Sequence, residues 1–375
     1  MKKSNIIFSI VFLFIIFFFF LFDIFTSDKD FSYSENRKLA QSPKLSIESV
    51  LDGTYMEKME TYVNDQIGFR DDFVKLSTKT KLLMGQKEIN GVYLSDGFLV
   101  EKFRNADLDL ELLEKNKNDI KLFLENHSNA YFGLIPTAGG VIDGLYPKYS
   151  DNINQQDMIN NLYDYVGIDS CINIFSILKK HSTEDIYYRT DHHWTTLGSY
   201  YGYLALCDGL GLNSIGLSDF EEILVDNEFE GTIQSKVNYN VGYDSIYKYV
   251  PKFDVKYQRI LNEDNRVISD TLYDESKLET KEKYAVFLGG NNAVVRIKIE
   301  NGVEDKGKLL IVKDSFSHCL TPFIVNHYSE VVLLDLRYYM GGVEQFMKNE
   351  NFNDILVLYN LNNFVSDRNL IRLNK

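Results

Sequence analysis

Cysteine is scarce in this chain of 375 residues, which contains only Cys171, Cys207 and Cys319. No two of them have the C-x-x-C spacing of zinc and redox motifs. An odd and sparse set of cysteines argues against a disulfide framework and against a structural zinc site. We therefore expect all three residues to be buried free thiols.

Positive charge is also in short supply. The 40 lysines and arginines are outnumbered by 54 aspartates and glutamates, which gives a net charge of −14. Because an acidic surface repels phosphate, this balance argues against nucleic-acid binding. The sequence is 45% hydrophobic and 14% aromatic, which supports a full hydrophobic core and excludes disorder throughout. Its length fits two or three domain-sized units, or one large domain with appendages.

Only one long apolar run occurs, over residues 6–22, and it carries no charge. A helix of this length reaches the short end of a bilayer span. The run is not followed by the small residues of a signal-peptide cleavage site, so we expect residues 1–27 to form an uncleaved, single-pass membrane anchor. Lys2 and Lys3 precede the run and favour a cytoplasmic N-terminus, which would place the rest of the chain outside the cytoplasm.

The residues that follow the apolar run predict a polar stalk and then a helix. Residues 28–85 are expected to form a polar stalk followed by a helical segment, since apolar residues recur at helical spacing between Tyr55 and Ile67. The segment 196–212 also has helical character, with Gly209 near its C-terminal end.

The C-terminal half predicts an α/β fold. Continuous apolar runs at 308–316, 331–337 and 354–361 are separated by helix-length segments. Such runs are typical of strands that are buried on both faces of a parallel sheet with crossover helices. Residues 86–375 are therefore expected to form one α/β domain, with a strand-rich insertion at about 218–300.

The sequence "KLLIVKDSF" places Ser315 where a buried strand ends and a helix begins. Ligands bind at the carboxyl edge of an open α/β sheet, and a helix N-terminus there can offer free N–H groups to an oxyanion. Ser315 is thus a candidate nucleophile, although the G-x-S-x-G pattern is absent. The alternative is that Ser315 or Asp314 caps the helix.

A matching base is found in "TDHHWTT". Asp191 and His193 are two residues apart, so in extended or turn backbone they project to the same side. The carboxylate can then fix the tautomer of the imidazole and leave its other nitrogen for Ser315. His192 would point the opposite way, and Trp194 would wall the pocket. The alternative is a structural histidine pair.

A metal hydrolase using Asp191, His192, His193 and His327 is a further alternative. The sequence has neither the H-E-x-x-H nor the H-x-x-E-H spacing, and adjacent histidines seldom both reach one metal ion. We therefore expect no metal site and no cofactor.

The stretch "TDHHWTTLGSYYGY" closely resembles the signature of the DHHW protein family, and it is similar to an element of the SGNH-hydrolase-like alginate O-acetylation proteins. The resemblance extends in order to other segments, among them "SENRKLAQSP", "FEGT", "FLGGNN", "VKDSFSHCLTPFI" and "VLLDLRYY". It implies an SGNH-like parallel sheet flanked by helices, as the catalytic domain. It also implies Ser315 as nucleophile, His193 as base and Asp191 as the residue that orients the base.

The resemblance implies an extracytoplasmic O-acetyltransferase that modifies a cell-surface or secreted polysaccharide through an acyl-serine. It also implies a multi-pass membrane O-acyltransferase as partner and acyl donor. Transfer to water instead would make the protein an acetyl esterase, and a retained pocket without chemistry would make it a binding or assembly scaffold. Asn291, Asn292 and Arg337 are further candidates for contacts to the substrate or the oxyanion.

Overall fold

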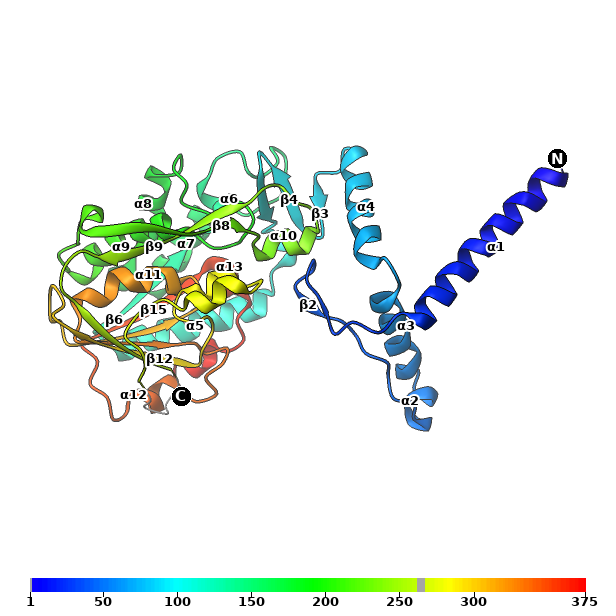
Figure 1. Cartoon of the computed structure of the whole chain (residues 1–375). Helices are drawn as coiled ribbons and strands as arrows, with labels where there is room; N and C mark the ends of the chain where they lie inside the picture. The colour runs from blue at the N-terminus through cyan, green and yellow to red at the C-terminus, as the bar shows by residue number, and fades with distance from the viewer. Residues whose placement is uncertain (1, 262–266) are drawn as a thin grey trace. The chain divides into compact units, whose positions relative to one another are not determined.

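A computed structural model describes residues 2–261 and 267–375 (Figure 1). The chain divides into two units. One contains residues 1–89 together with 235–240, and the other contains residues 90–234 and 241–375.

The N-terminal apolar run forms helix α1 (Lys2–Phe25). Within it, Ser4–Asp23 has a mean hydropathy of 2.9 and none of its apolar window is buried, so the helix is long and apolar enough to cross a membrane. These properties fit either a membrane anchor or a signal peptide.

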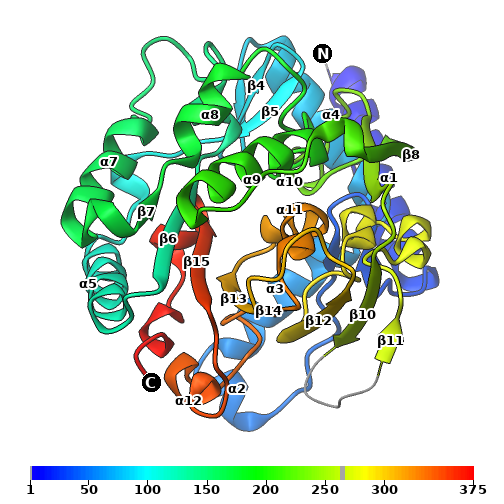
Figure 2. The same cartoon turned by 90° about the vertical axis from the view of Figure 1, so that its left-hand side faces the viewer.

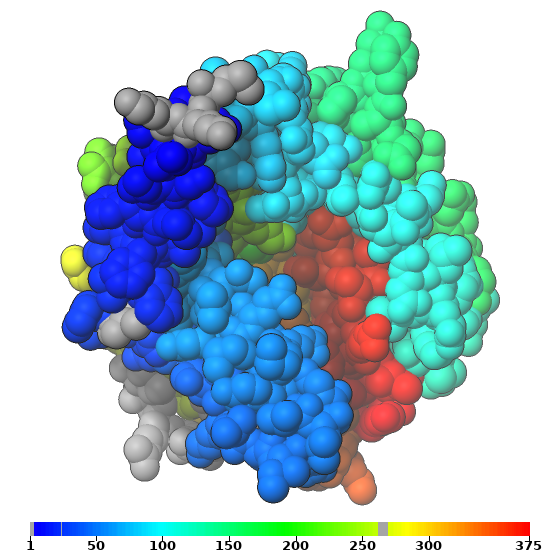
Figure 3. All heavy atoms as spheres, turned by 90° about the vertical axis from the view of Figure 1, so that its right-hand side faces the viewer, coloured from blue at the N-terminus to red at the C-terminus, as the bar shows by residue number. Residues whose placement is uncertain are grey.

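The rest of the first unit contains a short hairpin and helices, whose atoms are drawn in blue in Figure 3. Arg37 donates to Asp65 at 2.8 Å, and Arg70 pairs with Glu35 at 2.8 Å. These ion pairs connect the hairpin to the helices that follow it. The elements are β1 (Phe31–Ser32), β2 (Arg37–Lys38), α2 (Ile47–Leu51), α3 (Thr54–Gln66), α4 (Arg70–Leu83) and β3 (Glu88–Ile89).

The second unit is built on an eight-stranded sheet with the order β11-β10-β12-β14-β13-β15-β6-β7 (Figure 2). Its parallel part confirms the predicted α/β fold, because the three apolar runs form neighbouring strands whose side chains are almost all buried. The parallel strands are β6 (Ala130–Ile135), β7 (Cys171–Ile172), β13 (Lys308–Lys313), β14 (Glu330–Leu334) and β15 (Asp354–Asn360).

The segment 218–300 is rich in strands, and residues 262–266 of it lie outside the described residues. Its later strands extend the central sheet with antiparallel pairing, whereas its first two form a separate ribbon. The ribbon consists of β8 (Phe220–Phe229) and β9 (Asp244–Pro251), and the sheet strands are β10 (Lys256–Leu261), β11 (Val267–Ser269) and β12 (Val294–Glu300).

Helices flank the sheet in two groups. Helix α9 (Thr196–Leu210) contacts both α8 (Ile174–Lys180) and α11 (Ser317–Ile324), and α5 (Leu110–Asn126) contacts α7 (Gln155–Val166) and α13 (Leu361–Ser366). The remaining elements are the hairpin β4 (Val92–Ser95) and β5 (Phe98–Glu101) and the short helices α6 (Ala138–Val141), α10 (Thr232–Val237) and α12 (Val343–Met347).

Gly209 lies in the last turn of α9, near the C-terminal end of the helix as predicted, and an added Cβ there would come within 2.7 Å of Ile172. Gly211, with φ 63°, forms the left-handed cap. The expectation for the cysteines needs one correction. All three cysteines are free, but Cys171 is partly exposed because β7 lies at the edge of the sheet.

Candidate active site

Ser315 lies in the turn between β13 and α11, at the carboxyl edge of the parallel sheet. The preceding residue, Asp314, holds this turn. Its Oδ1 accepts a hydrogen bond from the N–H of Phe316 at 2.9 Å, and its Oδ2 accepts from the N–H of Asn360 and the amide of Asn363, both at 2.7 Å. The Ser315 side chain makes no helix cap, so its hydroxyl is left for another partner.

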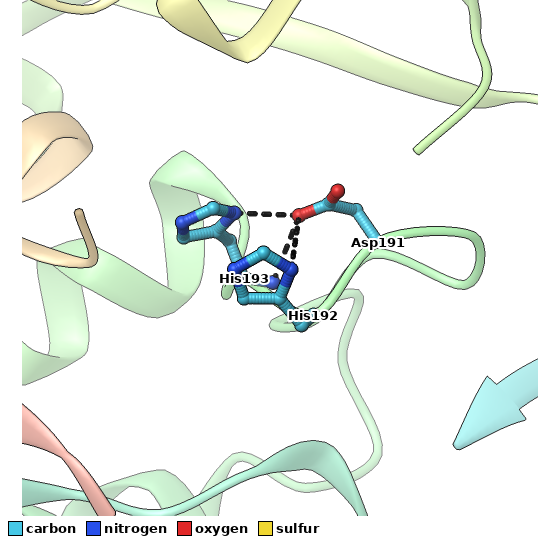
Figure 4. Close-up of side chains that lie close together, drawn as sticks. All are labelled: Asp191, His192 and His193. Carbon is cyan, nitrogen blue, oxygen red and sulfur yellow. Dashed lines mark hydrogen bonds and ion pairs between the residues drawn. The ribbon is translucent and has the colours of Figure 1, made fainter. Parts of the chain in front are cut away.

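That partner is His193. The Ser315 Oγ lies 2.8 Å from His193 Nε2, and His193 Nδ1 lies 2.5 Å from Asp191 Oδ1. Figure 4 shows the Asp191 carboxylate directed at the imidazole. With the Nδ1 proton donated to the carboxylate, Nε2 is free to accept the proton of the serine hydroxyl. The structure therefore brings the predicted nucleophile, base and acid together.

The Asp191 carboxylate is fully occupied by donors. Its Oδ1 also accepts from the N–H of His193 at 3.0 Å, and its Oδ2 accepts from the N–H and the hydroxyl of Thr232, both at 2.8 Å. Thr232 approaches this closely because Gly231 packs on the loop, where an added Cβ would lie 2.3 Å from Asp191 Cβ. The "FEGT" segment thus fixes the orientation of the acid.

Hydrogen bonds fix the start of the loop that carries Asp191 and His193. Asp244 accepts hydrogen bonds from the N–H groups of Arg189 and Thr190 at 3.0 and 2.8 Å, and from the Thr190 hydroxyl at 2.6 Å. The N–H of Tyr188 donates to the carbonyl of His193 at 3.2 Å. These bonds hold the backbone between Tyr188 and His193 in one conformation.

Two rings lie close to the imidazole of His193. Tyr284 stacks on it with a centroid distance of 3.9 Å and an interplanar angle of 12°, and its hydroxyl donates to the Ser315 carbonyl at 3.2 Å. His192 lies on it at 3.9 Å, and its Nδ1 is 2.8 Å from the Thr232 hydroxyl. The expectation that His192 points away is wrong, because the loop bends here instead of running extended (Figure 4).

The surroundings lower the pKa of both the acid and the base. Burial raises the pKa of Asp191, but the neighbouring histidines and the hydrogen bonds from His193 and Thr232 outweigh it and hold that pKa well below its usual range. Burial and the charge of His192 lower the pKa of His193 to about 4, against the pull of Asp191. The pair is therefore an ionised carboxylate and a neutral imidazole near pH 7, which is the state a general base requires.

The helix N-terminus does not supply the free donors that the sequence suggested. The N–H of Phe316 is bonded to the Asp314 side chain, and those of Ser317 and His318 are bonded to the carbonyls of Asp314 and Ser315. These three N–H groups at the start of α11 are therefore satisfied within the protein.

Trp194 is completely buried, so it does not present its ring to a pocket. Its Nε1 donates to the Phe316 carbonyl at 2.9 Å, and its ring packs where a Cβ on Gly202 would come within 2.6 Å. Trp194 therefore connects the loop of the base with the turn of the nucleophile. A separate small pocket beside Asp191 and His192 is lined in part by Thr137, Ile233 and Asn363.

Arg337 lies in a buried ionic cluster. Its guanidinium donates twice to Asp335, at 2.9 and 2.7 Å, and Asp335 also accepts from the fully buried Lys313 at 3.1 Å. The amine of Lys313 lies 2.7 Å from His318 Nε2. Burial lowers the pKa of Lys313, and burial and the Lys313 charge lower that of His318. Arg337 contributes to the low pKa of His193, so its charge acts on the site.

Asn291 and Asn292 lie in the glycine-rich turn before β12. Asn291 is exposed, and the amide of Asn292 donates to the carbonyl of Gly290 at 3.2 Å. Among the residues that the structure describes, no hydrogen bond joins either side chain to Ser315.

The proposed four-residue metal set is not assembled. Asp191, His192 and His193 each offer one ligand atom, and these atoms lie within 4.8 Å of one another. His327, however, is bound to the hydroxyl of Tyr203 at 2.8 Å and to Glu304 at 3.0 Å. Those contacts place His327 in another part of the fold.

A family model described as DHHW protein matches residues 113–334. No curated protein sequence matches the chain. Among solved structures, a DHHW family protein from Eubacterium siraeum has a TM-score of 0.66 and 24% identity over 77% of this chain and 96% of that one. Bacillus cereus PatB1 with a sulfonyl adduct has a TM-score of 0.61 and 20% identity over 76% and 100%. The O-acetyltransferase domain of Pseudomonas putida AlgJ gives 0.44 and 11%, over 74% and 93%.

Proposed function

The chain belongs to the DHHW protein family, and from this premise and the geometry of its site we propose that it is a serine acyl-transfer enzyme. The observation that supports the proposal most is the continuous hydrogen-bonded series from Ser315 Oγ to His193 and on to Asp191, with distances of 2.8 and 2.5 Å. Nucleophile, base and orienting acid in this arrangement define the triad chemistry of acyl transfer on many folds.

In the first half-reaction, His193 Nε2 takes the proton of Ser315 as the Oγ attacks the acyl carbonyl. Asp191 stabilises the imidazolium that forms, because its carboxylate is already ionised and bonded to Nδ1. Collapse of the tetrahedral intermediate returns the proton from His193 to the leaving group and leaves an acyl-Ser315. We further propose Arg337, Asn291 and Asn292 as sources of polar contacts to the substrate or the oxyanion, with Trp194 positioning the loop.

In the second half-reaction, His193 deprotonates a sugar hydroxyl, which attacks the acyl-serine. The ester bond to Ser315 Oγ then breaks, His193 returns the proton to Ser315, and the acylated sugar leaves. We propose an O-acetyl group and a cell-surface or secreted polysaccharide as acceptor. We propose a membrane-anchored protein, which the apolar N-terminal helix supports, with its site outside the cytoplasm, which Lys2 and Lys3 before the helix favour. Acetyl-CoA is absent there, so the proposed donor is a multi-pass membrane O-acyltransferase.

The test is a transfer assay on the full-length protein in detergent, with p-nitrophenyl acetate as donor and a panel of oligosaccharides as acceptors. Wild type is expected to form acetylated oligosaccharide, detected by mass spectrometry, whereas Ser315→Ala and His193→Ala are expected to form none. Release of acetate with no acetylated sugar would replace transfer by hydrolysis. If wild type and Ser315→Ala show the same rate, the enzyme assignment fails and a binding scaffold is supported.

A further inference from the structure

A groove of about 440 Å³ lies beside the loop that carries the acid and the base, and it is separate from the small pocket at His192. Its walls come from the segment before the triad loop (Asp185–Arg189), the start of α9 and the strand β9 with the residue that precedes it. The volume falls in the range of ligand sites in proteins, which is roughly 300–1,000 Å³. Nothing in the proposed chemistry uses this groove.

Two tyrosine rings in the groove have no internal role. Tyr243 is 56% exposed and Tyr247 is 37% exposed. Within the described part of the chain, neither hydroxyl has a hydrogen-bond partner and neither ring contacts another ring. Ser245 and Tyr247 are two apart on β9 and share a face, and Tyr243 directly precedes the strand; all three line the groove. Extended backbone from Tyr243 to Tyr247 spans about 13 Å, a length comparable to a few linked sugar rings.

The walls of the groove are fixed before any ligand binds. The Thr196 hydroxyl donates to the Tyr247 carbonyl at 2.6 Å, and the hydroxyl of Tyr249 donates to Glu222 on the paired strand β8. Asp244 bonds the N–H groups of Arg189 and Thr190. These bonds preorganise the backbone next to Tyr243 and Tyr247, which lowers the conformational entropy lost when a ligand binds.

The charges in the groove select against acidic ligands. Asp185 is 88% exposed and Glu222 is exposed, and among the described residues Arg189 is the one basic residue that lines the groove. Arg189 lies 3.7 Å from Asp185, so its charge is largely compensated locally. The remaining carboxylate oxygens accept hydrogen bonds, and sugar hydroxyls are donors of the right kind. A polyanion would be repelled.

We propose that this groove binds a chain of uncharged sugars, with Tyr243 and Tyr247 stacking on the sugar rings and Glu222 and Asp185 accepting from their hydroxyls. The groove contacts both ends of the loop that holds Asp191 and His193, so the bound chain lies against the backbone that orients the triad. The identity of this chain as the acyl acceptor rests on the proposed function, whereas the binding itself does not.

The test measures binding by calorimetry with the full-length protein carrying Ser315→Ala, which removes acyl transfer from the readout. The probes are cellohexaose, the hexamer of N-acetylglucosamine, and hexagalacturonate. We expect at least one neutral hexamer to bind, and the added double substitution Tyr243→Ala/Tyr247→Ala to weaken it about tenfold or more, the loss expected for two aromatic contacts. The pair Tyr243→Phe/Tyr247→Phe keeps the rings and is expected to retain binding.

The matched control is Tyr149→Ala, since Tyr149 is 91% exposed and lies outside the groove. It is expected to leave binding unchanged. The proposal is overturned if neither neutral hexamer binds, if the double alanine variant binds as well as its parent, or if hexagalacturonate binds more tightly than both neutral probes. Failure of the transfer assay with intact binding would refute the acyl-transfer function and leave the groove assignment standing.

Discussion

Asp191→Asn is the substitution that most sharply separates the orientation of the base from the stability of the fold. The carboxylate accepts two hydrogen bonds on each oxygen, from His193 on one side and from Thr232 on the other. An amide has only one acceptor oxygen, so its NH₂ group must face one of these two donor pairs. Each pair contains a backbone N–H that cannot adapt, and one N–H is left without an acceptor in either orientation.

The expected loss of unfolding free energy is therefore about 1–3 kcal/mol, the penalty of one unsatisfied buried donor. The loss of activity is larger. A unit charge about 4 Å from the imidazolium contributes about 4 kcal/mol at an effective dielectric constant of about 20. If the NH₂ group of the introduced asparagine faces His193, it donates to Nδ1, and the imidazole then carries its own proton on Nε2. In that tautomer Nε2 cannot accept the serine proton. We expect kcat to fall by about 10³ to 10⁴ with little change in KM.

The assay is steady-state hydrolysis of p-nitrophenyl acetate, with unfolding by urea measured on the same preparations. Asp164→Asn is the matched control, because Asp164 is exposed on α7 and far along the chain from the site. It is expected to leave both quantities unchanged. A kcat for Asp191→Asn within tenfold of wild type would refute the role given to the carboxylate.

Three further predictions follow from the same geometry. The neutral form of His193 is the base, and the pKa of His193 is about 4. Therefore kcat/KM should rise with pH through about pH 4 and then stay flat to neutrality. A rise centred at pH 6.5 would contradict the role given to His193. Gly231→Ala places a Cβ 2.3 Å from Asp191 Cβ. The substitution should therefore lower the unfolding free energy by about 1–3 kcal/mol and reduce kcat. A kcat at the wild-type level would count against the close packing of Gly231 on Asp191. Tyr284→Phe removes the hydrogen bond from the hydroxyl to the Ser315 carbonyl but keeps the stacked ring. The unfolding free energy should therefore fall by about 1 kcal/mol, while kcat stays near the wild-type value. A large loss of kcat would show that the hydroxyl takes part in the reaction.

The parallel core of the fold could be predicted from local sequence, which also made Asp191, His193 and Ser315 candidates that the family resemblance then combined into one site. Strands buried on both faces read as continuous apolar runs, as in β13, β14 and β15. Asp191 and His193 are two apart, and Ser315 follows a buried strand, so each half of the site has a local signature.

The residues that hold the site in place could not be predicted from local sequence. Thr232 reaches Asp191 across 41 residues and Tyr284 reaches Ser315 across 31, and their hydrogen bonds depend on where the ribbon and the β12 side of the sheet pack. Trp194 was expected at a pocket wall, because an aromatic residue beside a histidine pair suggests binding. Its indole is buried instead, since its N–H has a partner in Phe316 and its ring fits against Gly202.

The central claim is that Ser315 is a nucleophile activated by His193. Labelling of the full-length protein with a fluorophosphonate, followed by mass spectrometric mapping of the modified residue, tests it most directly because the adduct does not turn over. The account predicts one modified residue, Ser315, with labelling slowed strongly in His193→Ala and absent in Ser315→Ala. Equal labelling of wild type and Ser315→Ala, or modification at another residue, would contradict it.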